Sequence, residues 1–502
     1  MPRLPLLAGS RVPVVAAPED AVVLRPPAPR DPIADIASAV RDSLRFPLSG
    51  PPLEALATPG GRATIVVEPP ELPFPGAPQD PRQAALAATL DELERLGIRG
   101  ESVTILVAGG LSRRAGQREL EMLLTPPRAR GFHGRAVAHD CEGELVELGE
   151  ADDVRLCVAR ELVETDVVVT VTAAETVLDG GAAALLGAAG PEALRAAEST
   201  SLLETRGSRG WQLALALERT LARRVPLIGT SLVLNHPRLS GSYYRGYPFE
   251  RSSYAAVARS PLRRLLNLAP DGIRRATLAS LAREVTAVAA FGGPPSVAHA
   301  EALLRGISLR GTRLERQLDA IVIPIPWQDR HLPHEQLNPV TTAALGLGLA
   351  LRLWRDAFPL VEGGTAILMH GLSRRYAPAT LPYRGLLANL RDGDLSAGEA
   401  ADAADPSALA AYRSGRACHP LLPYRDWASC RPALDRLGAV VVAGCRDAQS
   451  ARTLGFVPTH GMGPALTMAH GRAGAEARIG FLVAPPYPPL VVGPTEPGGG
   501  GA

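Results

Sequence analysis

The chain has 502 residues, 46% of them hydrophobic and 21% charged, as expected for a globular protein of about two to four domains. Its formal net charge at pH 7 is only +2, and no basic stripe with interleaved aromatic residues occurs. The composition therefore excludes a typical nucleic-acid-binding protein. All 53 lysine-or-arginine positions are arginine, which excludes a Schiff base, a lysine general base and a lysine-tethered cofactor.

The cysteines are odd in number, far apart and never in a Cys-x-x-Cys pair. They are Cys141, Cys157, Cys418, Cys430 and Cys445. This pattern predicts reduced thiols, without a disulfide framework or a zinc cage. No signal-peptide pattern stands out, and no run of about 18 apolar residues occurs. We therefore expect a cytoplasmic protein without a membrane partner.

The first predicted elements follow a proline-rich beginning. Residues 1–31 are rich in proline and arginine, which predicts an extended N-terminal lead-in. Helical spacing over Pro32–Leu44 is followed by a short buried strand at Arg62–Val67 and by a helix at Pro81–Leu96.

Two predicted strands end in glycine turns that precede helices. The strand Val103–Val107 ends at Gly109-Gly110, and the strand Asp166–Thr172 leads to Asp179-Gly180-Gly181. In a parallel sheet, such turns bring backbone N–H groups to the carboxyl edge, where they can cradle a phosphate or carboxylate. Most strand–glycine–helix turns are only turns, so the pattern alone does not establish a ligand site.

Further strands alternate with helices and extend the same pattern. Helices are predicted at Gly210–Arg224 and at Thr341–Phe358. Strands are predicted at Val225–Leu234, Asp319–Pro324, Gly364–His370, Ala439–Ala443 and Ile479–Ala484. The alternation predicts an α/β fold with two domains, each a mainly parallel sheet flanked by helices, and a cleft between them. The sequence does not place residues 240–283.

The expected domain boundaries follow from these elements. An N-terminal α/β domain is predicted over residues 32–285 and a C-terminal α/β domain over residues 300–488. Residues 489–502 form a glycine- and proline-rich end that is expected to be a disordered tail.

The order of these motifs resembles the nickel-pincer-dependent lactate racemase family. The stretches that support the resemblance are Ile65–Pro75, Leu90–Arg113, His139-Asp140, Ala159–Gly187, Ala287–Ala300, Asp319–Pro324 and Val361–Met369. The resemblance covers about residues 32–485, and its support is the order of the motifs rather than any single one. It implies a nickel-bound, nucleotide-derived pincer cofactor in the cleft. It also implies racemisation or epimerisation of a 2-hydroxy acid by reversible hydride transfer.

Several functional positions of the family are replaced in the first domain. The family motif Ser-Asp-x-Thr-Arg-Pro corresponds to residues 68–73, where the acid falls on Pro69 and the arginine on Leu72. The family motif Gly-Thr-His-Arg corresponds to residues 110–113. Ser112 therefore stands at the position of the first catalytic histidine, while Arg113 is retained.

The remaining motifs are also altered. The segment Glu175–Ala183 lacks the family histidine and places Ala183 where the family has a lysine that holds the cofactor. Near the Gln-x-x-Lys pair, Gln336 is retained and Pro339 takes the place of the lysine. Serine is too weak a base to replace imidazole unaided, and alanine cannot tether a cofactor. These replacements indicate divergent or lost catalysis.

The candidate site residues follow from the motifs and from nearby polar groups. Replacement catalytic candidates are His139, His331, His334 and, at the family histidine position, Ser112. Candidates for holding a cofactor or anion are Gly109, Gly110, Arg113, Gly180, Gly181 and Gln336. No residue is assigned as a metal ligand.

Structural interpretations remain open for these candidates. The segment Asp329–Glu335 can supply two imidazoles or be only a polar loop. His139-Asp140 can be a structural hydrogen-bonded pair. Arg113 and Arg114 can clamp an anion or lie solvated at a helix start.

Three functional hypotheses fit the sequence. The chain can be a divergent isomerase acting on a small 2-hydroxy acid through replacement histidines. It can be a non-catalytic protein that keeps a small-anion site and acts as the partner of an active homologue. It can also be an enzyme of another class that binds a hydroxy-acid or nucleotide-like ligand without nickel.

Overall fold

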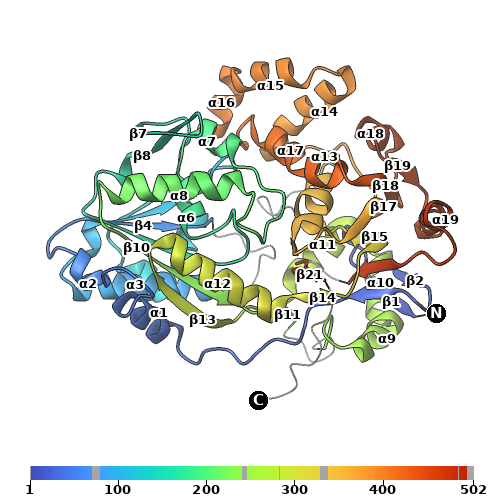
Figure 1. The fold of residues 1–502 in the computed structure, drawn as a ribbon, viewed down its shortest axis with the longest axis horizontal. Helices are drawn as coiled ribbons and strands as arrows, with labels where there is room; N and C mark the ends of the chain where they lie inside the picture. Colours follow the sequence, from blue (N-terminus) through green and yellow to red (C-terminus); the bar gives the residue numbers. More distant parts are fainter. Residues whose placement is uncertain are drawn as a thin grey trace.

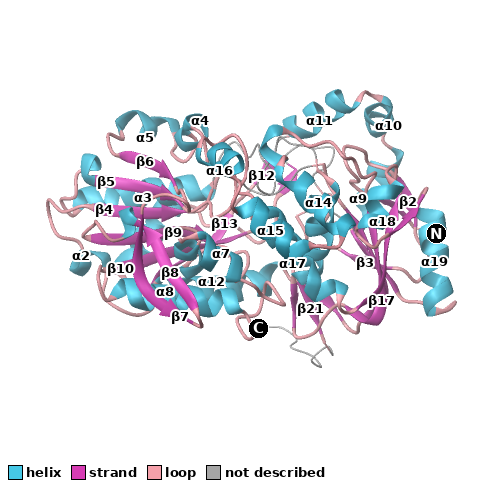
Figure 2. Ribbon diagram, turned by 90° about the horizontal axis from the view of Figure 1, so that it is seen from above, coloured by secondary structure: helices cyan, strands magenta, loops and turns pink. Residues whose placement is uncertain are grey.

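The computed structural model describes residues 2–69, 80–239, 246–281, 283–327, 337–483 and 486–493. Within them the chain forms two α/β parts that lie side by side (Figures 1 and 2). We call the part built on the first sheet the first half and the part built on the second sheet the second half. The predicted α/β class, with two mainly parallel sheets flanked by helices, is confirmed.

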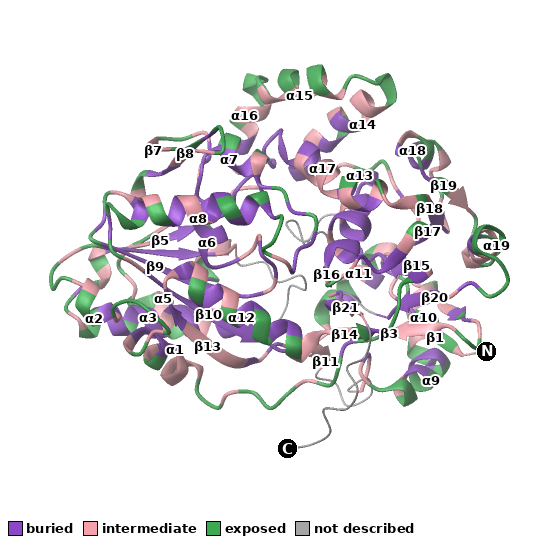
Figure 3. Ribbon diagram, viewed as in Figure 1, coloured by how far each residue is buried: buried purple, intermediate pink, exposed green. Residues whose placement is uncertain are grey.

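The first half contains a six-stranded sheet in the order β13-β10-β9-β4-β5-β6. Its strands are β4 (Ala63–Val67), β5 (Val103–Val107), β6 (Arg135–Ala138), β9 (Val167–Ala173), β10 (Leu227–Leu234) and β13 (Ala287–Gly293). All neighbours are parallel except β13, which is antiparallel to β10. Every residue of β4 and of β9 is buried, as expected for strands covered on both faces (Figure 3).

Alternate residues of β4 enter two different cores. Ile65 packs with helices α1 (Ile36–Arg45) and α3 (Pro81–Arg95), whereas Val66 packs with α6 (Ala182–Leu186) and α8 (Arg209–Ala222). This is the period of two expected of a strand, and it places one helical layer on each face of the sheet.

The second half contains an entirely parallel sheet in the order β19-β18-β17-β15-β20-β3. Its strands are β3 (Val22–Leu24), β15 (Leu318–Pro324), β17 (Leu360–Met369), β18 (Leu437–Ala443), β19 (Val457–Thr459) and β20 (Ile479–Leu482). Helix α17 (Leu422–Leu434) packs in one core of this sheet, and α19 (Met462–Ala473) packs in the other.

The N-terminal segment is more ordered than the extended lead-in predicted for residues 1–31. Strands β1 (Arg3–Pro5) and β2 (Val14–Ala16) form an antiparallel pair, and β3 adds an edge to the second sheet beside β20. Leu4, Leu6 and Val15 are buried in the same core as Phe481. Apolar side chains placed between the prolines give this segment enough surface to bury.

The chain passes between the halves more often than a two-domain division predicts. Helices α9 (Arg251–Arg259), α10 (Pro261–Leu268) and α11 (Asp271–Ser280) follow the first-half strand β10, and Tyr254 of α9 lies in the core of the second half. The chain then returns to the first half with β13 and with α12 (Pro295–Arg310), which packs on β10 and β13. The predicted range 32–285 therefore includes helices that pack on the other half.

The C-terminal segment also contributes a strand. In the range predicted as a tail, β21 (Leu490–Val492) pairs with β14 (Thr312–Leu314) and β16 (Trp354–Arg355). Residues 494–502 lie outside the described residues. Among the helices that the structure describes, none combines the length and apolar character needed to cross a membrane.

Candidate functional site

The carboxyl ends of three first-half strands meet at a small cavity of about 110 Å³. Glu68 follows β4, Gly109 and Gly110 follow β5, and the segment that leads to Gly180 follows β9. Ser112 and Ala183 also line this cavity, so the structure brings together the altered family positions that we derived from the sequence. Ligands of parallel α/β proteins bind at this edge of a sheet.

The backbone N–H groups of the glycine turns are already used within the protein. The Gly110 N–H donates to the carbonyl of Gly187 at 2.9 Å, and the Gly109 N–H donates to Val107 at 3.0 Å. The Gly181 N–H donates to the hydroxyl of Thr172 at 2.9 Å. The sequence pattern suggested that these N–H groups could cradle an anion. In the structure all three are engaged within the protein and are not available to do so.

Close packing against α12 requires glycine at positions 180 and 181. Both have positive φ angles, +96° and +52°. A Cβ atom on Gly181 would lie 2.2 Å from Cβ of His299 and 2.6 Å from the carbonyl oxygen of Pro295. The second glycine turn is thus explained by helix packing and left-handed backbone, without a ligand.

His299 supports this turn from the protein interior. Its ring is fully buried, with Nε2 2.8 Å from the carbonyl oxygen of Thr176 and Nδ1 3.4 Å from Oγ of Ser231. Burial lowers the pKa of His299, so the ring is neutral at pH 7. We did not assign this histidine from the sequence, although it lies in the stretch Ala287–Ala300 that contributes to the family resemblance.

Glu68 is one of the titratable groups that line the small cavity, together with Arg82, Glu175, Asp179 and Arg425. Its Oε2 accepts a hydrogen bond from the Ala173 N–H at 3.1 Å and lies 3.3 Å from Nη1 of Arg82. Within the described residues, Oε1 has no hydrogen-bond partner. Burial raises the pKa of Glu68 to about 7 against the opposing charge of Arg82, and the carboxylates of Asp179 and Glu175 add to the rise.

Arg425 reaches the same cavity from the second half. It extends from α17, and its Nη1 lies 3.9 Å from the position that a Cβ on Gly110 would occupy. Its guanidinium has no hydrogen bond or ion pair with any residue that the structure describes. An unpaired, half-buried guanidinium at a cavity is suited to bind a carboxylate or phosphate.

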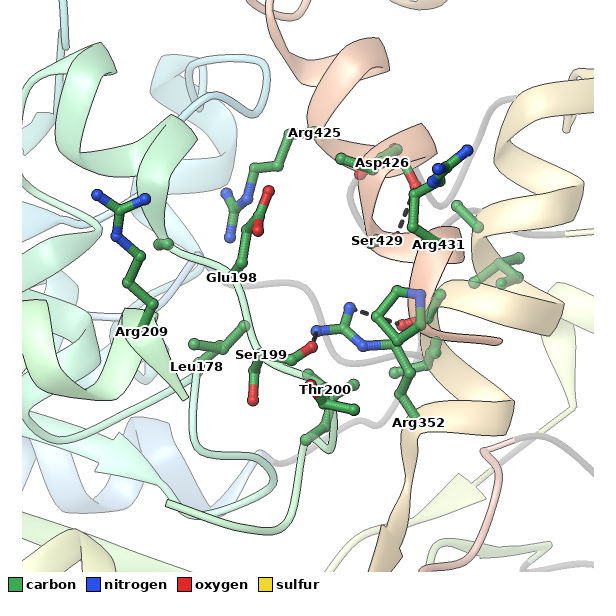
Figure 4. Close-up of a pocket in the computed structure, with 18 of the residues that line it drawn as sticks. Leu178, Glu198, Ser199, Thr200, Arg209, Arg352, Arg425, Asp426, Ser429 and Arg431 are labelled. Carbon is green, nitrogen blue, oxygen red and sulfur yellow. Dashed lines mark hydrogen bonds between the residues drawn. The ribbon is translucent and has the colours of Figure 1, made fainter. Parts of the chain in front are cut away.

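A larger cavity of about 600 Å³ adjoins the first and lies between the two halves. Leu178, Asp179, Ala197 and Arg425 line both cavities. Arginines dominate its charged lining, namely Arg195, Arg209, Arg352, Arg425, Arg431 and Arg436. In Figure 4, Arg425 and Glu198 project into the same part of this cavity.

Most of these arginines are already engaged. Arg195 pairs with Glu399 at 2.5 Å, and Arg431 lies 3.8 Å from Asp435. Arg436 lies over the ring of Phe358, 5.3 Å from its centroid. Arg195 and Arg431 therefore have acidic partners, and the guanidinium of Arg436 lies on an aromatic ring.

Arg352 is a buried arginine of the cavity wall and has no ion pair with any described residue. It donates to the carbonyl of Gly348 at 3.2 Å and to the carbonyl of Ser199 in the first half. Its Nε has no partner, and no carboxylate pairs with it among the described residues. Burial lowers the pKa of Arg352 to about 10, so it stays charged at pH 7 and leaves positive charge in the cavity wall.

Two predicted site residues lie away from both cavities. His139 is buried with Nε2 2.9 Å from the carbonyl oxygen of Ala189, and burial lowers its pKa. Arg113 pairs with Glu119 and donates to the carbonyl of Arg114. Both residues are therefore engaged within the protein, His139 with Ala189 rather than with Asp140, and Arg113 in an ion pair rather than solvated. His331, His334 and Gln336 lie outside the described residues.

A cluster of Cys141, Glu142 and His419 has the residue types of a metal site, with ligand atoms within 4.8 Å of one another. The Leu421 N–H donates to Nδ1 of His419 at 3.1 Å, so the ring proton of neutral His419 resides on Nε2. That Nε2 lies 3.1 Å from Oε1 of Glu142. The cluster is therefore a hydrogen-bonded contact between the halves, because the nitrogen that would bind a metal carries a proton.

Comparison with known proteins supports the family resemblance. Residues 11–204 match the family model of the lactate racemase N-terminal domain. The whole structure resembles the lactate racemase apoprotein from Thermoanaerobacterium thermosaccharolyticum, with a TM-score of 0.60 and 15% identity over 98% of this chain and 99% of that chain. At this identity the likeness establishes the fold alone.

A protein from Thermotoga maritima gives a TM-score of 0.49 at 12% identity, over 93% of this chain and all of the other. No curated protein sequence matches the chain.

Proposed function

We propose that this chain, whose residues 11–204 match the lactate racemase N-terminal domain, binds a small anion between its halves without nickel-pincer hydride transfer. The observation that supports the proposal is the unpaired Arg425, which lines both cavities and lies over Gly110. The ligand class is a small carboxylate, such as a 2-hydroxy acid, or inorganic phosphate.

The residues at the small cavity do not fit the family cofactor. Ala183, at the lysine position, lines the small cavity and has no amine that could hold the cofactor. No histidine lines either cavity in the part of the chain that the structure describes. We therefore derive no reaction step through nickel or the pincer cofactor.

Two arginines without an acidic partner among the described residues favour an anion as the ligand, although the carboxylates of Glu68, Glu175 and Asp179 also line the small cavity. Among the described residues, Arg425 has no acidic partner within hydrogen-bonding distance, and Arg352 is bonded only to carbonyl oxygens. In a low-dielectric cavity, an anion that pairs with Arg425 relieves the cost of burying an uncompensated guanidinium. Glu68 and Glu198 can accept hydrogen bonds from a ligand hydroxyl, which favours a hydroxy acid over a simple carboxylate.

Calorimetric titration of the purified chain with D-lactate, L-lactate and phosphate tests the proposal. We expect saturable binding of at least one anion, weakened by tenfold or more in Arg425→Ser, as for loss of a charge-assisted hydrogen bond. Arg305→Ser is the matched control, because Arg305 is exposed on α12 and lines neither cavity. Equal affinities of wild type and Arg425→Ser would refute the assignment.

Glu68 favours a second candidate, a metal-free isomerase. A carboxyl group with a pKa of about 7 that lines a cavity can give and take protons at neutral pH. Racemisation of a 2-hydroxy acid by the chain alone, lost in Glu68→Gln, would support this candidate. Anion binding without racemisation would support the binding function and contradict the isomerase.

A further inference from the structure

Helix α10 has its apolar side turned towards solvent. Leu262, Leu265 and Leu268 are 59%, 65% and 84% exposed, and Ile273 at the start of α11 is 57% exposed. The three leucines recur every third residue, so they share one side of the helix. No residue of α10 is fully buried.

Two polar side chains of α10, those of Arg263 and Asn267, face the protein and hold the helix in this orientation. Nη1 of Arg263 donates to the carbonyl of Val12 and Nη2 to that of Ala258, each at 3.0 Å. The side-chain amide of Asn267 both accepts from the N–H of Val12 and donates to its carbonyl, each at 2.9 Å. A surface helix ordinarily buries its apolar stripe and exposes its polar side. Here the hydrogen bonds fix the reverse arrangement.

The helical segment that presents these leucines is strongly basic. Residues 251–281 contain six arginines and one acidic residue, Asp271. Asp271 already pairs with Arg274 and Arg275. Arg264 of α10 is exposed and has no ion pair with any described residue, whereas the exposed Arg251 and Arg259 belong to α9 and not to the helices that carry the leucines.

An apolar cavity of about 490 Å³ lies between α10, α11 and the segment around Pro237 and Pro248. Leu262, Leu265 and Ile273 belong to its lining. The cavity gives an apolar chain a place to enter next to the exposed leucines. Figure 2 shows α10 and α11 at the outer edge of the molecule, where a large surface can approach them.

We propose that the α10–α11 face binds peripherally to an anionic lipid bilayer. The leucines would enter the boundary between headgroups and acyl chains, and Arg264 would lie against a lipid phosphate. A second copy of the chain is a poorer occupant, because two such faces would bring like charges together. This proposal revises the expectation of no membrane partner, which considered only spanning segments.

Flotation of the full chain with vesicles tests the proposal. We expect binding to phosphatidylcholine vesicles that contain about one third phosphatidylglycerol, little binding to pure phosphatidylcholine, and release by added salt. Leu265→Glu and Arg264→Ser should each weaken binding by roughly tenfold. The matched controls are Leu304→Glu, at a leucine of α12 that is 49% exposed, and Arg305→Ser.

Three results would overturn the proposal. One is the absence of flotation with anionic vesicles, and another is equal binding to neutral vesicles. The third is a native mass that doubles with concentration in wild type but not in Leu265→Glu, which would assign the face to a second copy. Because Leu265 is exposed, its variant should keep the wild-type unfolding midpoint, and that measurement separates lost binding from lost folding.

Discussion

The hydroxyl of Tyr412, in the second half, lies 3.3 Å from the carbonyl oxygen of Gly110 and 3.2 Å from the amide nitrogen of Cys141, both in the first half. Tyr412 is fully buried and packs edge-to-face on the ring of His419, with centroids 5.0 Å apart. A single hydroxyl thus donates to one first-half loop and accepts from another, beside the glycine turn over which Arg425 lies.

Tyr412→Phe should lower the free energy of unfolding by about 1–3 kcal/mol, because it leaves the buried N–H of Cys141 without an acceptor. Urea unfolding checks this. Tyr376→Phe is the matched control, since the buried Tyr376 hydroxyl has no hydrogen-bond partner among the described residues, and its loss should be neutral or stabilising. Equal losses in the two variants would contradict the role of the Tyr412 hydroxyl.

Glu68 should make stability fall as pH rises through neutrality. Its pKa is raised from 4.5 to about 7 in the folded chain, so between these values the folded chain holds a proton that the unfolded chain has released. The free energy of unfolding should therefore decrease from pH 5 to pH 7, by at most about 3 kcal/mol from this group.

Glu68→Gln should flatten this decrease, as measured by urea unfolding at pH 5 and pH 8. Burial also raises the pKa of Glu218 to about 7, so part of the slope should persist in that variant and disappear in the double variant with Glu218→Gln. Glu101→Gln, at an exposed position, serves as the control. An unchanged slope in Glu68→Gln would contradict the raised pKa.

Gly181→Ala should destabilise the chain by about 3 kcal/mol or more, because the new methyl group would overlap His299 and the carbonyl of Pro295. Gly207→Ala separates sterics from backbone strain, since Gly207 has a φ of +72° with nothing near its Cβ position. That control should cost only about 1 kcal/mol. Thermal unfolding of both variants tests the difference, and similar losses would mean that the α12 contact is not limiting.

Zinc and chelators should leave the unfolding midpoint unchanged. The hydrogen bond from Leu421 to Nδ1 of His419 keeps the proton on Nε2, so the cluster with Cys141 and Glu142 does not offer an imidazole lone pair. Burial also raises the pKa of Cys141 to about 12, which disfavours the thiolate that zinc prefers. A midpoint that rises with added zinc, and does not in His419→Gln, would show the opposite.

The alternation of strands and helices was sufficient to predict both sheets, because buried parallel strands have a distinctive β-branched composition. It also predicted that Gly109, Gly110 and Gly180 would meet at one sheet edge. Helical periodicity predicted the secondary structure less well in a segment that packs closely against another helix. The helix expected over Thr341–Phe358 is instead α13 (Pro339–Ala343), π-type and 3₁₀ turns to Arg352, and then β16. There, a Cβ on Gly348 would lie 2.2 Å from Oγ of Ser429.

Arg425 and Arg352 could not be predicted as site residues. Both come from the second half, and nothing in their local sequence distinguishes them from the other arginines. Their importance arises from the absence of an acidic partner, which depends on how the halves are packed. The sequence likewise could not show that Gly181 donates its N–H to Thr172 rather than to an anion.

The pairing of β3 with β20 constrains the order in which the protein can be assembled. Val22 lies opposite Gly480, so this edge strand is synthesised long before its partner. Most first-half strands are complete by Leu234, apart from β13. The first half can therefore begin to fold on the ribosome, while the second sheet closes only after β20 has been translated. Until then, β1–β3 and the basic helices α9–α11 lack the surface on which they pack.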